Sequence, residues 1–240
     1  MKSEYNIDAK FERNIIQYLK DNKILESIGL AGVHFTDDYN SQKQGVDFSA
    51  MYRGRMCYVD VKSIASDFPT FSQEVMNTVS RNAGWMFNNK LQTTHILYTY
   101  HVVEGASNYA EGKRIVADDP SKIIRTECIL VPKKKVQDDI KKHLHLDCDV
   151  NTARSIAKAI ETQISKGAIR TTEPCYRFKV VNDNKRALRK IEKWETKGLQ
   201  MWITRSNNVA EHPINIVVRK QELIKLSTEH KIVNHQASAA

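Results

Sequence analysis

The sequence lacks any apolar run near the roughly 18 residues that a membrane-spanning helix needs. Its polar start, MKSEYNIDAKFER, lacks the apolar stretch of a secretory signal. The 4 cysteines lie far apart and show neither C-x-x-C spacing nor a zinc-ribbon pattern. No P-loop, G-x-G-x-x-G motif or Ser-His-Asp arrangement stands out. These absences predict a cytoplasmic protein with reduced thiols and no membrane partner.

The composition is that of a chain that folds around a core. Its 240 residues can bury a substantial apolar interior, and we find neither an internal repeat nor a low-complexity linker. The net charge of +9 indicates a surface that attracts polyanions. Many basic proteins bind no nucleic acid, so the charge supports that partner only together with other signals.

Hydrophobic periodicity predicts a mixed α/β chain. Apolar residues at helical spacing favour a helix over 9–28, and β-branched and aromatic residues favour a strand over 93–103. The remaining expected strands are 32–36, 46–51, 56–62, 123–131, 176–181, 199–204 and 214–218. The remaining expected helices are 71–87, 150–166, a basic helix over 184–194, and 221–230.

The segment Tyr52-Arg53-Gly54-Arg55 predicts a tight hairpin turn between the strands 46–51 and 56–62. In a hairpin, the residue numbers of two directly opposed residues always add up to the same value. A turn centred between Arg53 and Gly54 pairs Tyr52 with Arg55, and the same sum pairs Asp47 with Asp60. Opposed side chains share a face and lie roughly 5 Å apart at their β-carbons. Lys62, two residues beyond Asp60, shares the same face.

The opposed aspartates predict a cation site. Like charges directly opposite in a sheet are destabilising, so two facing carboxylates need a cation or a strongly raised pKa. Carboxylate oxygens suit Mg²⁺, which keeps several waters and also binds substrate phosphate. The alternative is an ordinary exposed sheet face on which Asp60 and Lys62 are surface residues. Because Val46, Phe48, Val59 and Val61 are apolar and point the other way, we expect one face in the core and one carrying chemistry.

Gly45-Val46-Asp47 followed by Tyr58-Val59-Asp60-Val61-Lys62 resembles the PD-(D/E)XK nuclease superfamily, which includes restriction endonucleases, Holliday-junction resolvases and phage-type exonucleases. The resemblance covers about the first hundred residues. It implies a restriction-endonuclease-like core of helix, three-strand meander, helix and strand within residues 1–105. Residues 106–240 would form a mixed α/β elaboration that contributes to substrate binding.

The resemblance also implies roles for individual residues. Asp47 and Asp60 would be ligands of Mg²⁺, with Mn²⁺ able to substitute, and the backbone carbonyl of Val61 would supply a further ligand. Glu12, on the first helix, would complete or support the metal shell. Lys62 would orient or help deprotonate the attacking water, or stabilise charge on the phosphate. Val46 stands where the family nominally has proline, which removes no ligand.

Weaker signals point to nucleic-acid contacts. Gln73 would lie on the helix after Lys62, although a solvated position is equally compatible with the sequence. On the expected helix 184–194, one face carries Arg186, Arg189, Lys190 and Lys193, which would bind phosphates or form a solvated face. Lys133–Lys142 is a second basic cluster. The alternating segment His143–Asp149 would be a weak transition-metal strand, and surface polarity explains it better.

These patterns together predict a Mg²⁺-dependent DNA endonuclease of restriction-like or phage type. A Holliday-junction resolvase, a DNA exonuclease, or a nucleic-acid-binding protein that keeps the fold without catalysis are the alternatives. The sequence leaves open whether the chain acts as a monomer or a homodimer.

Overall fold

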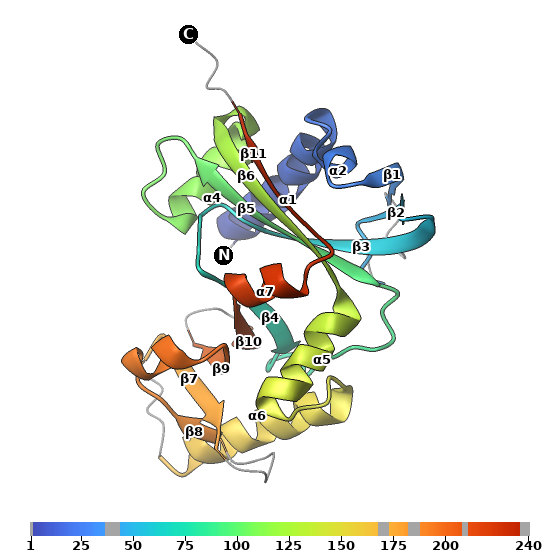
Figure 1. Cartoon of the computed structure of the whole chain (residues 1–240). Coiled ribbons are helices and arrows are strands. Elements are labelled where there is room, and N and C mark those ends of the chain that lie inside the picture. Colours follow the sequence, from blue (N-terminus) through green and yellow to red (C-terminus); the bar gives the residue numbers. More distant parts are fainter. Residues whose placement is uncertain (1, 37–43, 168–172, 182–187, 208–210, 236–240) are drawn as a thin grey trace. The chain divides into compact units, whose positions relative to one another are not determined.

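The computed structural model describes residues 2–36, 44–167, 173–181, 188–207 and 211–235 (Figure 1). The chain forms two compact units, each assembled from separate stretches of sequence. Unit 1 holds residues 1–68, 93–132 and 224–240, and unit 2 holds residues 69–92 and 133–223. The sequence analysis instead divided the chain at residue 105. Within the described ranges, no helix is both long and apolar enough to cross a membrane.

Unit 1 is built on a mixed sheet of six strands in the order β1-β2-β3-β5-β6-β11. β3 and β5 are parallel, and the other neighbouring pairs are antiparallel. The strands are β1 (Leu30–Phe35), β2 (Phe48–Tyr52), β3 (Arg55–Ile64), β5 (His95–Val103), β6 (Ile123–Pro132) and β11 (Glu229–Asn234).

Helices of unit 1 bury an apolar face against this sheet. They are α1 (Lys2–Asp21), α2 (Ile24–Ser27), α4 (Tyr109–Asp118) and the 3₁₀ turn η1 (Pro120–Lys122). Phe11, Ile15 and Leu19 recur at helical spacing on α1, and all three are buried with Val59 of β3 and Val116 of α4 in one core cluster. This core fixes α1 behind the strands that carry Asp60 and Lys62.

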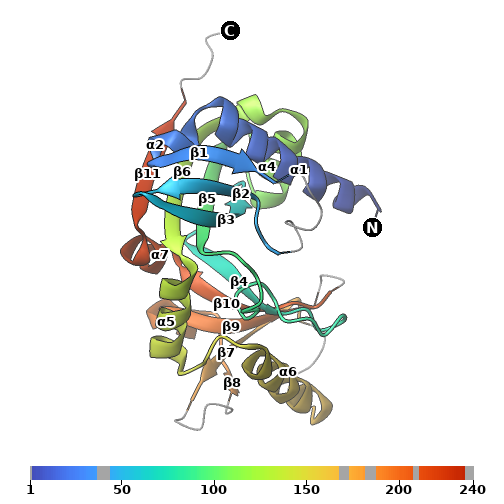
Figure 2. The same cartoon turned by 90° about the vertical axis from the view of Figure 1, so that its right-hand side faces the viewer.

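Unit 2 is built on an antiparallel sheet of five strands in the order β4-β10-β9-β7-β8. α6 lies against β4, and α5 lies against β9 (Figure 2). Its elements are β4 (Thr70–Met76), α5 (Lys133–Leu144), α6 (Val150–Ser165), β7 (Cys175–Val180), β8 (Leu188–Lys190), the 3₁₀ turn η2 (Trp194–Gly198), β9 (Met201–Ser206) and β10 (Ile214–Arg219). α7 (Lys220–Leu226) continues from unit 2 into unit 1.

The mixed α/β class is confirmed, together with the hairpin and the strands near 93–103 and 123–131. The helix predicted over 71–87 is wrong, because residues 70–76 form β4 and pair with β10. Every second side chain of β4, namely Phe71, Gln73 and Val75, is buried in unit 2. Because Gln73 is polar, the sequence does not show the alternation of apolar and polar residues that is typical of a strand.

One further predicted helix is wrong, and another is present but shorter than expected. Residues 188–190 of the expected basic helix are the strand β8, held by backbone pairing to β7, and residues 182–187 lie outside the described part of the chain. The helix expected over 221–230 ends at Leu226, and β11 begins at Glu229. β11 pairs with β6, which is about a hundred residues away in the chain, so local periodicity does not reveal it.

Candidate metal and phosphate site

The β2–β3 hairpin has the register that the sequence predicts. Phe48 pairs with Val59, and Tyr52 pairs with Arg55, as the predicted turn requires. The paired ladder ends at Phe48, so Asp47 lies one residue before it, and Asp47 meets Asp60 through its side chain. Arg53 and Gly54 both have positive φ, 49° and 77°, as a two-residue type I′ turn requires. Because the turn has only two residues, it allows a single register, and the side chains of both strands alternate between the core and the opposite face.

Asp60 and Lys62 form an ion pair on the face away from the core. The Nζ atom of Lys62 lies 2.8 Å from Oδ1 of Asp60, whose side chain is only 6% exposed. A carboxylate buried this deeply would cost several kcal/mol without a compensating charge. The Lys62 ammonium supplies that charge in the metal-free protein.

Asp47 precedes β2 and is fixed through both its backbone and its side chain. Its Oδ2 accepts a hydrogen bond from the backbone N–H of Val61 at 2.7 Å, and its own N–H donates to the carbonyl of Val59 at 2.9 Å. Thr36 donates to the Asp47 carbonyl from both its N–H and its hydroxyl, at 3.0 and 2.9 Å. The carboxylate of Asp47 therefore bridges directly to the strand that carries Asp60 and Lys62.

Asp47 carries the electrostatic signature of crowded carboxylates. Burial and the neighbouring negative charge of Asp60 raise the pKa of Asp47 from 3.8 to about 6, against the hydrogen bond from Val61 and the charge of Lys62. A hydrogen bond between the two carboxyl groups also favours the protonated form of Asp47. The repulsion between the two carboxylates is relieved when a cation binds or when one of them keeps its proton.

The raised pKa gives a testable pH dependence in metal-free protein. Because the folded pKa of Asp47 exceeds the ordinary value of 3.8, the proton on Asp47 stabilises the fold fully below about pH 4. This stabilisation is lost as the pH rises to about 6. Asparagine cannot ionise and still offers an oxygen to Val61, so we expect Asp47→Asn to be more stable than the parent above pH 6, by at most about 3 kcal/mol.

Melting temperatures of the two metal-free proteins, measured from about pH 3 to about pH 8, test this expectation. The curves should separate between about pH 4 and about pH 6 and stay separated above that window. Curves that run parallel over the whole range would contradict the crowded-carboxylate description of Asp47.

Lys62 stays protonated in this arrangement. Burial works against its ammonium, but the carboxylates of Asp60, Asp47 and Glu12 outweigh burial and raise the pKa of Lys62 above its ordinary value of 10.5. Beside these carboxylates Lys62 is therefore a hydrogen-bond donor and a positive charge. A role as proton acceptor, which the sequence left open, would require the opposite shift.

Glu12 of α1 also lies within electrostatic range of these residues. The side chain of Glu12 is exposed, but the protein atoms around it raise the pKa of its carboxyl above the ordinary value. The positive charge of Lys62 opposes this rise. Asp60 contributes in the raising direction. The structure thus brings the four expected residues Glu12, Asp47, Asp60 and Lys62 into one neighbourhood of unit 1.

A buried chain of hydrogen bonds lies behind β3, and the sequence analysis did not identify it. The Ser63 hydroxyl contacts the Thr99 hydroxyl at 2.6 Å, and Thr99 contacts Nε2 of His101 at 2.9 Å. Nδ1 of His101 lies 3.0 Å from the Thr126 hydroxyl, which lies 3.2 Å from the Tyr18 hydroxyl. Burial lowers the pKa of His101 to about 3, so His101 is neutral and links three strands to α1.

Other expected binding residues lie elsewhere. Gln73 is buried on β4 of unit 2 rather than exposed on a helix. Arg189 and Lys190 lie on β8, where Lys190 pairs with Glu173 at 2.5 Å. Lys193 precedes η2, and Arg186 lies outside the described residues. Arg189, Lys190 and Lys193 therefore do not lie on one helical face.

The weak transition-metal strand is also wrong, because His143 lies near the end of α5. Its Nδ1 is 3.2 Å from Oδ1 of Asp139 on the same helix. Across the described ranges, no group of three or more His, Cys, Asp and Glu side chains could hold a metal ion. Mg²⁺ needs only one or two carboxylates and keeps several waters, so a pair such as Asp47 and Asp60 falls below that group size.

We compared the chain with protein-family models, with curated proteins and with solved structures, and none of these comparisons produced a match.

Proposed function

We propose that this protein is a Mg²⁺-dependent nuclease that hydrolyses phosphodiester bonds, with DNA as its substrate and endonucleolytic cleavage as its activity. The observation that carries the proposal is the contact between the carboxyl groups of Asp47 and Asp60 beside the Lys62 ammonium. Two crowded carboxylates with one raised pKa are poised to accept a divalent cation. Mn²⁺ should substitute for Mg²⁺.

Each residue has a defined part in this proposal. Asp47, Asp60 and the Val61 carbonyl would hold the ion, and Glu12 would support them from α1. Bound there, Mg²⁺ would polarise the phosphate and make a water nucleophilic near neutral pH. Lys62, protonated beside Asp60, would donate to a phosphate oxygen and stabilise the negative charge that develops on it.

The arrangement of unit 1 supports a restriction-endonuclease-like core. α1 is followed by the antiparallel meander β1-β2-β3, and β5 then adds to the sheet parallel to β3. The connection between β3 and β5 differs from the expected helix, because it includes β4 of unit 2. The helix that joins α1 in the unit 1 core is α4, which follows β5 instead.

Charge and thiols are in keeping with this function. The net charge of +9 attracts a polyanionic substrate. Cys57, Cys128, Cys148 and Cys175 are all free thiols.

Incubation with supercoiled, linear, single-stranded and branched DNA, with Mg²⁺ or with a chelator, tests the proposal. We expect metal-dependent nicking of the supercoiled form, and cleavage of internal sites rather than digestion from ends. Preferential cutting of branched DNA would instead support the resolvase alternative. DNA binding without cleavage of any substrate, in either Mg²⁺ or Mn²⁺, would contradict the proposal and favour a non-catalytic binding protein.

A further inference from the structure

A hollow in unit 2 gathers three cationic side chains that the sequence analysis did not identify. Its volume is about 350 Å³, and Arg81, Arg154 and Lys158 line it together with Glu161. Arg154, Lys158 and Glu161 are exposed and lie on one face of α6 at intervals of four and three residues. Arg81 comes from the loop that follows β4.

The loop holds Arg81 in an uncommon backbone conformation. Arg81 has a φ of 57°, a left-handed conformation that L residues other than glycine rarely adopt. Oδ1 of Asn77 accepts from the N–H groups of Val79 and Ser80 at 3.0 and 2.9 Å. The Asn77 N–H donates to the Asn82 carbonyl at 3.1 Å. The loop is therefore internally bonded and presents the Arg81 side chain at its exposed tip.

The three cations of the hollow lack acidic partners. In the part of the chain that the structure describes, none of Arg81, Arg154 and Lys158 forms an ion pair. Glu161 also lines the hollow, but its carboxylate interacts electrostatically with Arg205 as well. The hollow is therefore positively charged and open to an anion.

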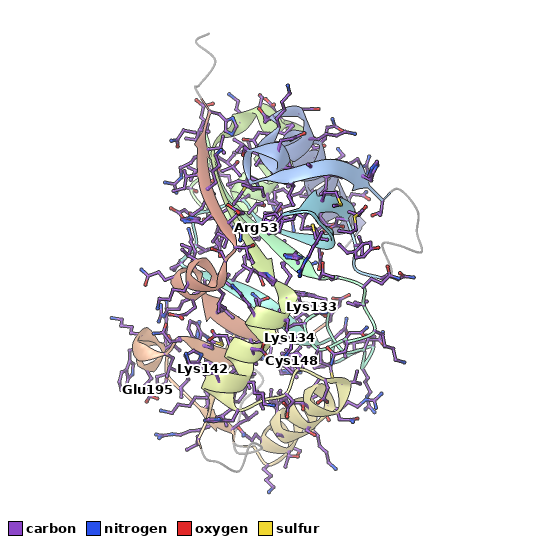
Figure 3. The ribbon with its side chains drawn as sticks, turned by 45° about the vertical axis from the view of Figure 1, so that its right-hand side comes forward. Arg53, Lys133, Lys134, Lys142, Cys148 and Glu195 are labelled. Carbon is purple, nitrogen blue, oxygen red and sulfur yellow. The ribbon has the colours of Figure 1, made fainter. Side chains whose placement is uncertain are left out.

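Three lysines of the basic cluster on α5 already have protein partners. Figure 3 marks Lys133, Lys134 and Lys142 on α5. Lys133 is buried, with its Nζ 3.3 Å from the Asn88 carbonyl, and Lys134 pairs with Asp138. Lys141 of the same helix pairs with Asp147 at 2.8 Å. In contrast, Arg81, Arg154 and Lys158 line one hollow together.

We propose that the hollow lined by Arg81, Arg154 and Lys158 binds phosphates of a nucleic-acid backbone. Guanidinium groups match phosphate oxygens with two parallel hydrogen bonds, and the Lys158 ammonium adds a third charge. Such contacts position the duplex and carry no sequence information. The identity of the ligand rests on the proposed nuclease function, whereas the charge of the hollow does not.

The test measures binding of a fluorescent DNA duplex by anisotropy across a salt series, in protein that carries Asp60→Asn to prevent cleavage. The triple variant Arg81→Gln, Arg154→Gln, Lys158→Gln is compared with a control, Lys135→Gln, Lys142→Gln, Lys166→Gln. The control removes the same charge from exposed positions of unit 2. Each phosphate contributes about −0.9 to the slope of log K against log salt.

For the hollow variant we expect a slope smaller by up to roughly three units, which reduces the loss of affinity between about 50 and 200 mM salt by up to roughly 40-fold. The control should change the slope far less. Equal slopes for the hollow variant and the parent, or an equal change in the control, would overturn the proposal.

A single variant, Arg81→Gly, separates function from folding. Glycine adopts positive φ without strain, so the melting temperature should stay level or rise while DNA binding weakens. A variant that binds as tightly as the parent would contradict the role of Arg81. Cleavage is measured separately in protein that keeps Asp60. If that protein does not cut DNA but the hollow variants lose DNA binding, the hollow is supported and the nuclease proposal is refuted.

Discussion

Asp60→Asn should abolish DNA cleavage, lowering its rate by about three orders of magnitude or more, while the protein remains folded. The change replaces one of the two carboxylates that would hold the cation. A bound metal ion stabilises the transition state by several kcal/mol. Each step of about 1.4 kcal/mol corresponds to a tenfold change in rate. Asparagine is isosteric with aspartate, so packing around this buried position should persist. Nicking of supercoiled DNA and circular dichroism measure the two effects.

Asp118→Asn is the matched control for this variant. Asp118 is an exposed residue of α4 in the same unit, and its replacement should leave the cleavage rate unchanged. Identical purification of both variants also reveals any contaminating nuclease, because contamination would cut equally in each. Folded Asp60→Asn protein that cuts at the parent rate would remove Asp60 from the mechanism.

Lys62→Ala should lower cleavage by roughly 10²- to 10³-fold, the range typical of losing one donor to the charge that develops in the transition state. Mn²⁺ binding should survive, because Lys62 is not a ligand in the proposed site. The structure adds an expectation about stability. Without the ammonium at 2.8 Å, Asp60 is left buried and uncompensated, so the metal-free variant should melt at a lower temperature.

Added Mn²⁺ should restore part of that lost stability, because the cation replaces the missing positive charge. Lys122→Ala is the control, since Lys122 pairs with Glu104 at 2.9 Å on an exposed surface of the same unit. Its loss should change neither cleavage nor melting temperature appreciably. Unchanged turnover in Lys62→Ala would show that Lys62 acts only as a structural counter-charge.

The hairpin was predictable because its geometry is local. A two-residue turn at Arg53 and Gly54 sets the register, and strict alternation then determines which side chains share a face with Asp60. The same arithmetic places Asp47 near Asp60 from the sequence alone. Local rules suffice wherever a few consecutive residues determine the geometry.

The α5 helix shows a signal that was present but was read differently. Val136, Ile140 and Leu144 are all buried and recur every four residues, as an amphipathic helix requires. Interpreting Lys133–Lys142 only as a charge cluster concealed this spacing. The helix explains why the lysines of that segment differ so much in exposure.

Other features depend on distant partners and were beyond sequence reasoning. β8 is a strand because its backbone pairs with β7, although its basic residues also suit a helix. The buried chain from Ser63 through His101 to Tyr18 joins residues separated by more than a hundred positions. Tertiary pairing overrides weak local propensity in such segments.

Calorimetric titration with Mn²⁺ tests the central claim most directly, because it measures the proposed metal site without any substrate. The parent protein should bind Mn²⁺, and Asp47→Asn and Asp60→Asn should each lose that binding, while Asp118→Asn retains it. Mn²⁺ binding of equal strength in the parent and in both site variants would show that the opposed carboxylates do not hold the metal, and would contradict the account.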